Sequence, residues 1–97
     1  MRIISRKTLS DYWETHEIVR APLQAWFAEA ENARWKSPAE IKKRYPSGDP
    51  VGDNRFVFNI KGNDYRLVVK IHYNTGIIYI RFIGTHAEYD KINAEEI

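Results

Sequence analysis

Three residues in the second half of the chain have the side-chain chemistry needed to break a phosphodiester bond in RNA. Arg66 lies in the segment YRLVVK, and His86 and Tyr89 lie three residues apart in THAEYD. RNA carries its own nucleophile, the 2′-hydroxyl. Cleavage then needs a group that takes the hydroxyl proton, a cation beside the phosphate, and a group that protonates the leaving 5′-oxygen. Histidine exchanges protons near neutral pH, and arginine offers phosphate a planar fork of donors. Arg66, His86 and Tyr89 are therefore candidate catalytic residues for such a reaction.

Further polar residues in the same region could hold the backbone of an RNA strand: Lys61, Asn63, Lys70 and Arg81. Each candidate also has an ordinary structural interpretation. His86 could brace a helix, Tyr89 could be a packing residue, and the arginines could be solvated or paired with nearby carboxylates. Residue types and spacing alone thus leave open a basic-faced domain that only binds RNA.

Three expected strands would position these side chains: Arg55–Ile60, Tyr65–Tyr73 and Ile77–Ile83, joined by turns in an antiparallel meander. Successive side chains of a strand alternate between the two faces of a sheet. One face is then predicted to be apolar and to carry Phe56, Phe58, Ile60, Leu67, Val69, Ile71, Ile78, Ile80 and Phe82. The opposite face is predicted to carry Arg55, Asn59, Arg66, Lys70, His72, Tyr79 and Arg81.

Helical spacing dominates the first half of the chain. Leu9, Tyr12, Trp13 and His16 form one stripe, and Leu23, Trp26, Phe27 and Ala30 form a second. We expect the second helix to begin with Pro22 in its first turn and to run to about Arg34. Ile3-Ile4 could form an edge strand. Ser37-Pro38-Ala39-Glu40 predicts a short helix with a capping box, followed by a loop from Pro46 to about Asn54.

The expected fold is α+β, a single domain over residues 1–97 with the N-terminal helices packed on one face of a small antiparallel sheet. After the last strand, Thr85 and Glu88 have the spacing of another capping box. The short helix that they predict would bring His86, Tyr89 and Asp90 together at the end of that strand.

Charge is distributed unevenly along the chain, although the formal net charge is only +2. Residues 34–44 hold five basic side chains against Glu40 alone, and residues 55–86 hold five against Asp64 alone. Such segregation suits a surface that binds a polyanion, with ordinary solvated charge as the alternative. The chain has no cysteine, no apolar run of membrane-spanning length and no signal-peptide pattern. We expect a reduced, cytoplasmic protein without membrane contact.

The sequence also resembles a known family in its motifs. The hairpin FNIKGN-x-YRLVV, the terminal GTHAEYDKI and the upstream WKSPAEIK at residues 35–42 are similar to those of the HigB toxins of the RelE superfamily. The resemblance spans essentially the whole chain. It implies the RelE-like fold and the toxin of a type II toxin–antitoxin pair, neutralised by a cognate helix-turn-helix, HigA-like antitoxin.

The resemblance also implies an activity, namely endoribonuclease cleavage of mRNA, often at the ribosome. On that basis we expect attack by the 2′-hydroxyl with no metal and no cofactor. Arg66 resembles the phosphate-binding arginine of the superfamily, and His86 and Tyr89 fall where RelE-like toxins place acid–base and stacking residues. The alternatives are a non-catalytic RNA- or ribosome-binding module that uses the same basic face, and a protein-interaction domain whose helices dock a partner.

Overall fold

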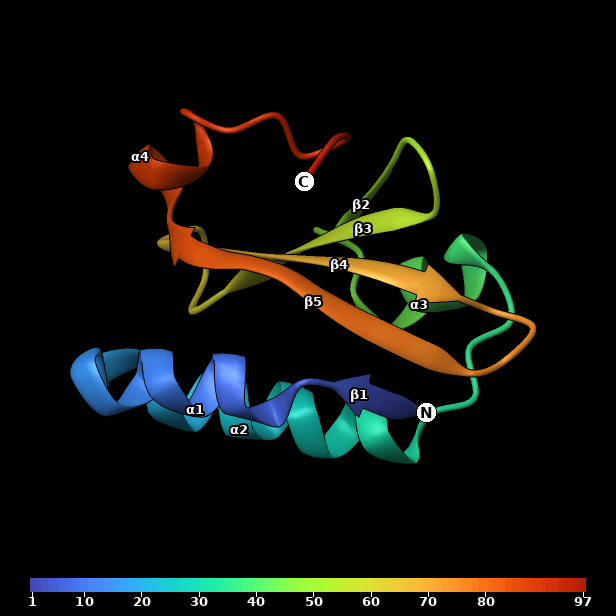
Figure 1. Ribbon diagram of the computed structural model, residues 1–97, viewed down its shortest axis with the longest axis horizontal. Helices are drawn as coiled ribbons and strands as arrows, with labels where there is room; N and C mark the ends of the chain where they lie inside the picture. Colours follow the sequence, from blue (N-terminus) through green and yellow to red (C-terminus); the bar gives the residue numbers. More distant parts are fainter.

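One mixed sheet of five strands, in the order β1-β5-β4-β3-β2, forms the centre of the molecule. A computed structural model describes residues 1–97 (Figure 1). Its elements are β1 Arg2–Ile4, α1 Arg6–Thr15, α2 Glu17–Asn32, α3 Pro38–Arg44, β2 Asp49–Val51, β3 Arg55–Ile60, β4 Tyr65–His72, β5 Ile77–Thr85 and α4 His86–Tyr89. Helices α1 and α2 lie side by side on one face of the sheet, and α4 follows the end of β5 (Figure 1). The α+β prediction is confirmed.

The predicted meander is present as β3, β4 and β5, paired antiparallel. A parallel pairing of β1 with β5 confirms the expected edge strand. The prediction of a plain loop from Pro46 to Asn54 was wrong, because β2 lies inside it and pairs with the open edge of β3. Pro50 is tolerated in β2 because an edge strand does not need every N–H group for pairing.

Helix α2 begins at Glu17, five residues before the predicted first turn at Pro22. His16 is the C-cap of α1 and the N-cap of α2. Its carbonyl accepts a hydrogen bond from the Val19 N–H at 3.0 Å. Proline lacks the N–H that would reach back to the Ile18 carbonyl. Ile18 is 60% exposed. Water can bond a carbonyl at such an exposed position, so the proline is accommodated inside the helix.

The main core lies between the two long helices and the predicted apolar face of the sheet. Helices α1 and α2 contribute Leu9, Trp13, Val19, Leu23, Trp26 and Ala30, and the sheet contributes Phe56, Phe58, Ile60, Leu67, Val69, Ile71 and Ile78. Trp26 meets Phe58 edge to face with ring centroids 5.3 Å apart, a favoured aromatic geometry. Helix α3 adds Ile41, and its Ser37 N-cap is confirmed by a bond from the Glu40 N–H.

A bulge in β5 changes the face of every residue that follows it. Val68 pairs with Phe82 and Val69 pairs with Ile80, so Arg81 has no partner opposite it on β4. Phe82 therefore shares the outer face with Val68, whereas Ile83 packs against the main core. The prediction that placed Phe82 on the helix-covered face, with Arg81 opposite, was wrong for this reason.

The outer face of the sheet is not open along its whole length, because the C-terminal segment crosses it. Ala94 is buried against Val57 and Val68, and Ile97 packs on the same cluster. Arg55 is only 6% exposed, and its Nε donates to the Ile97 carbonyl at 2.6 Å. Arg55 thus lies on the predicted face with Lys70, but the C-terminal segment covers it, which the sequence did not predict. The polar surface left on this face centres on the first residues of β4 and on α4.

Candidate active site

Helix α4 is held in place by reciprocal hydrogen bonds at its start. The Thr85 hydroxyl accepts from the Glu88 N–H at 3.2 Å, and a Glu88 carboxylate oxygen accepts from the Thr85 N–H at 2.8 Å. This confirms the predicted capping box. The bond from the Thr85 N–H, followed by the Thr85 side chain, lowers the pKa of Glu88 below its ordinary value, because it favours the charged carboxylate. The His86 N–H donates to the Asp64 carbonyl at 3.0 Å and ties α4 to the β3–β4 turn.

Arg66 stands near the start of β4, half-buried, opposite Gly84 of β5. Its Nη1 donates to the carbonyls of Asn63 at 2.9 Å and Tyr65 at 3.3 Å. The guanidinium carbon lies 5.9 Å from the centroid of the Tyr89 ring. These contacts fix the guanidinium on one side and leave its Nε and Nη2 donors without a protein partner. Such donors are available to a phosphate oxygen.

His86 is paired with an acid on its own helix. Its Nδ1 lies 3.3 Å from Oδ2 of Asp90, one helical turn further on, and about half of the imidazole surface is exposed. With Nδ1 turned to the carboxylate, Nε2 is the nitrogen open to solvent. A carboxylate in this position holds an imidazole in one tautomer and orientation. The sequence analysis expected Asp90 near His86 but did not predict that the two side chains pair, although their i,i+4 spacing indicates such a pair.

Tyr89 links α4 to the outer-face cluster. Its ring centroid is 6.5 Å from that of Phe82, and the ring packs beside Val57 and Val68. One side of the tyrosine is thus committed to packing while Arg66 lies over the ring. Because β4 and β5 are paired so that Tyr65 meets Thr85, the capped helix follows directly beside Arg66. The structure therefore brings Arg66, His86 and Tyr89 to one corner of the sheet.

The four predicted RNA-contacting residues do not all lie at this corner. Lys61 and Asn63 do, since they belong to the β3–β4 turn. Lys61 adopts a left-handed backbone (φ 53°), uncommon for a residue with a Cβ, and its Nζ lies 3.4 Å from Asp64 Oδ2. Lys70 lies four residues along β4, where it pairs with Asp53 at 3.2 Å. Arg81, in the bulge, lines a shallow depression with α1 instead.

A second polar group at this corner was missed by the sequence reasoning, which treated Tyr12 and His16 as parts of a helix stripe. The two rings stack with centroids 3.9 Å apart, and Tyr65 meets Tyr12 edge-on at 6.3 Å. The Tyr12 hydroxyl is buried without a hydrogen-bond partner. Burial, with smaller contributions from Glu88 and Tyr65, raises the pKa of Tyr12 to about 12. The stack of Tyr12 on His16 has the i,i+4 spacing of one helix, whereas the approach of Tyr65 from β4 had no local signal.

Comparison with known proteins supplies the family. The family model described as HigB toxin, RelE-like toxic component of a toxin–antitoxin system, matches residues 19–92. The chain belongs to the HigB toxin family. A relative from Escherichia coli K12, named mRNA interferase toxin HigB, is 32% identical over 97% of this chain and 92% of its own length. Proteins named mRNA interferase HigB from Escherichia coli O157:H7 and Shigella flexneri show the same identity and coverage.

Family membership agrees with the α+β architecture. A HigB-family chain is the toxin of a toxin–antitoxin pair, so it has an antitoxin as a partner. The matched region includes the β3–β4 hairpin, Arg66, His86 and Tyr89. None of the helices has the length and apolar character that a membrane span requires. The chemistry available at the corner is a fixed cation over a phenol ring, and an imidazole oriented by a carboxylate on the same short helix as the phenol.

Proposed function

We propose that this HigB-family protein is an endoribonuclease that cleaves mRNA at the corner formed by β4, the β3–β4 turn and α4. The observation that carries the proposal is the arrangement of Arg66. Its Nη1 is anchored by two carbonyls, while its remaining donors have no protein partner and the guanidinium lies over the ring of Tyr89, on the same short helix as His86. The names of the relatives, which call them mRNA interferases, supply the substrate class.

The reaction follows from these groups without a metal ion or cofactor. Nε2 of His86 removes the proton from the 2′-hydroxyl, whose oxygen attacks the adjacent phosphorus. Arg66 neutralises the charge that grows on the phosphate oxygens. The P–O5′ bond breaks, and the leaving 5′-oxygen takes a proton from the imidazolium or from Tyr89. The products are a 2′,3′-cyclic phosphate and a 5′-hydroxyl end, and the proton taken from the 2′-hydroxyl replaces the one given to the leaving oxygen.

The other predicted residues would bind the strand rather than react with it. Lys61 and Asn63 would hold the backbone next to the scissile phosphate from the β3–β4 turn. Lys70 and Arg81 would contact the RNA farther from it, since neither lies at the corner. Cleavage would take place on mRNA associated with the ribosome, and a HigA-like helix-turn-helix antitoxin would block the activity.

A cleavage assay with purified components tests the proposal. The protein is incubated with mRNA in the presence and absence of translating ribosomes, each with and without EDTA. We expect cleavage that resists EDTA, is strongest on translated message, and is lost in Arg66→Ala and His86→Ala variants that still bind the antitoxin. RNA binding without cleavage in every condition would contradict the proposal and favour a non-catalytic RNA-binding module.

A further inference from the structure

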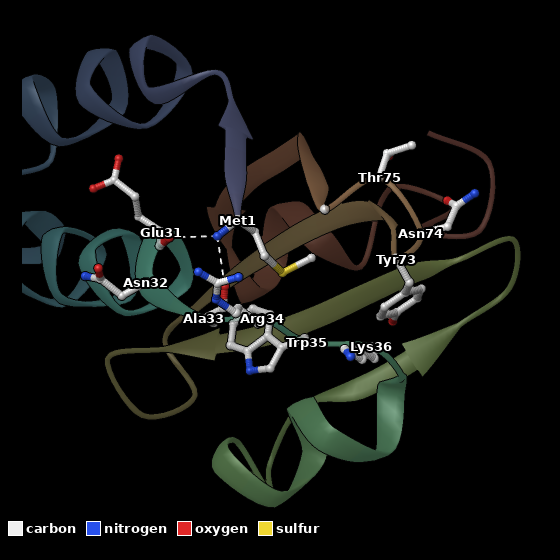
Figure 2. Close-up of a pocket in the computed structure, with 11 residues that line it drawn as sticks. Met1, Glu31, Asn32, Ala33, Arg34, Trp35, Lys36, Tyr73, Asn74 and Thr75 are labelled. Carbon is white, nitrogen blue, oxygen red and sulfur yellow. Dashed lines mark hydrogen bonds between the residues drawn. The ribbon is translucent and has the colours of Figure 1, made fainter.

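A pocket of about 500 Å³ lies at the other end of the sheet from the proposed active site. Residues 31–36, which leave α2, line one side of it, and the β4–β5 hairpin residues Tyr73–Gly76 line the other (Figure 2). At the end of α2, the Met1 nitrogen donates to the carbonyl oxygens of Glu31 at 2.7 Å and Ala33 at 2.9 Å (Figure 2). The volume falls in the range of pockets that hold one small ligand or one nucleotide-sized group.

Two cations line this pocket on either side of a buried tryptophan. Trp35 is buried, whereas its neighbours Arg34 and Lys36 are exposed. Trp35 is 8% exposed and packs against Tyr45 and Phe58. The buried indole therefore fixes the backbone between the two basic residues and holds both at the pocket.

Neither cation has a partner side chain or carbonyl within the protein. No salt bridge and no side-chain hydrogen bond of the structure involves Arg34 or Lys36. Their basic neighbours differ, since Lys42 pairs with Asp49 at 2.9 Å and Arg44 pairs with Glu29. Of the five basic residues at 34–44, Lys42 and Arg44 are thus paired and three are free, and two of these three, Arg34 and Lys36, share one pocket. Free charges in a concave site raise the local concentration of anions.

The remaining lining suits a nucleotide better than a simple anion or an acidic peptide. Tyr73 offers an aromatic ring, and the Asn74 side chain has an amide that makes no bond within the protein. Single-stranded RNA is bound by this combination of basic groups, aromatic surface and amides. Glu31 on the rim can accept from a ribose hydroxyl or a base amino group. An acidic peptide offers backbone N–H donors to the same carboxylate but has no base to place against the Tyr73 ring.

We propose that this pocket is a second RNA-binding site, with Arg34 and Lys36 on a phosphate of a single-stranded segment and Tyr73 against its base or ribose. The inference rests on the proposed ribonuclease function, which supplies RNA as the ligand. Tyr73 directly follows β4 and lies seven positions after Arg66, or about 23 Å away in extended chain. The pocket therefore binds nucleotides several positions from the cleaved bond, or a segment of ribosomal RNA.

Binding is measured separately from cleavage. The probe is a fluorescent 2′-O-methyl oligoribonucleotide of about twelve nucleotides, which lacks the attacking hydroxyl. The variant is Arg34→Ala/Lys36→Ala, and the matched control is Lys43→Ala, an exposed lysine that has no ion pair and lies outside the pocket. Thermal unfolding of both variants is compared with that of the wild type. A second probe, ribosomes free of mRNA, distinguishes ribosomal RNA from message as the source.

We expect the double variant to bind one or both RNA probes about tenfold more weakly, with the salt dependence of log K reduced by about 0.7, the value for one lost phosphate contact to a single strand. Lys43→Ala should match the wild type. Cleavage of a dinucleotide, which reaches only the proposed active site, should be unchanged in the double variant. If the wild type cleaves no RNA, the proposed function is refuted, but the binding measurement still tests the second site. Unchanged affinity for both probes would overturn the inference, and so would a loss confined to antitoxin affinity.

Discussion

Replacement of Arg66 by alanine should separate catalysis from folding. The two carbonyl bonds at Nη1 hold the guanidinium in place before RNA binds, so its free donors need no reorganisation when charge grows on the phosphate. Loss of one such preorganised donor typically costs about 10²–10³ in kcat, or about 3–4 kcal/mol. The folded state loses the two carbonyl bonds, worth about 1 kcal/mol each, and the contact of the guanidinium with the Tyr89 ring at 5.9 Å, worth about 0.5–1 kcal/mol.

Single-turnover cleavage of a short RNA, together with denaturant unfolding, measures both quantities. Arg66→Lys should recover part of the rate, because an ammonium keeps the charge but not the planar fork. Arg81→Ala is the matched control. It removes the same side chain from the β5 bulge, away from the corner, and should leave kcat unchanged while raising KM modestly. A folded Arg66→Ala protein with kcat within threefold of the wild type would refute the assignment.

Other substitutions test the supports of the same corner. Asp90→Asn should lower kcat about tenfold or more with little effect on KM, because an amide can turn its NH₂ group toward Nδ1 of His86 instead of an oxygen acceptor. Equal rates in the variant and the wild type would show that Asp90 has no part in the mechanism. Thr85→Ala should cost about 1 kcal/mol of α4 stability and speed amide exchange over residues 86–89, with a parallel fall in kcat; unchanged exchange would show that the cap does not hold the helix. Tyr12→Phe removes a buried hydroxyl without a partner and should leave stability at pH 7 equal or slightly higher. The pKa of Tyr12 is raised to about 12, so the wild type should lose stability as pH rises from about 10 to 12. Across that pH range, the free energy of unfolding should change less with pH in the phenylalanine variant than in the wild type. An equal pH dependence in the two proteins would contradict the contribution of the Tyr12 phenol.

Local sequence patterns predicted the elements that position the proposed active site. The capping box of Thr85 and Glu88 needs only four consecutive residues, and it is present as predicted. The alternation in β3 and β4 predicted the buried face there, and the turn at residues 61–64 followed from its residue types. These features are encoded within a few residues of one another, so a reading along the chain can recover them.

The errors arise where distant segments decide the outcome. Alternation through Ile80-Arg81-Phe82 is unbroken in the sequence, and only pairing with β4 reveals the bulge. Arg55 is covered by a residue 42 positions away, a contact that no local pattern encodes. The start of α2 was missed because Pro22 was expected in a first turn, whereas an exposed turn around Ile18 accommodates it inside the helix. The two free cations at the second pocket likewise emerge only once Lys42 and Arg44 are seen to be paired.

The chemistry of the RNA ends tests the central claim most directly. A short RNA that the wild-type protein cleaves at one bond is prepared again with a single 2′-deoxy nucleotide on the 5′ side of that bond, and products are analysed by mass spectrometry in EDTA. Attack by the 2′-hydroxyl at the Arg66–His86 corner predicts a 2′,3′-cyclic phosphate and a 5′-hydroxyl from the all-ribose RNA, and no cleavage at the modified position. Cleavage of the 2′-deoxy substrate at the same bond, or a 5′-phosphate on the downstream product, would contradict the account.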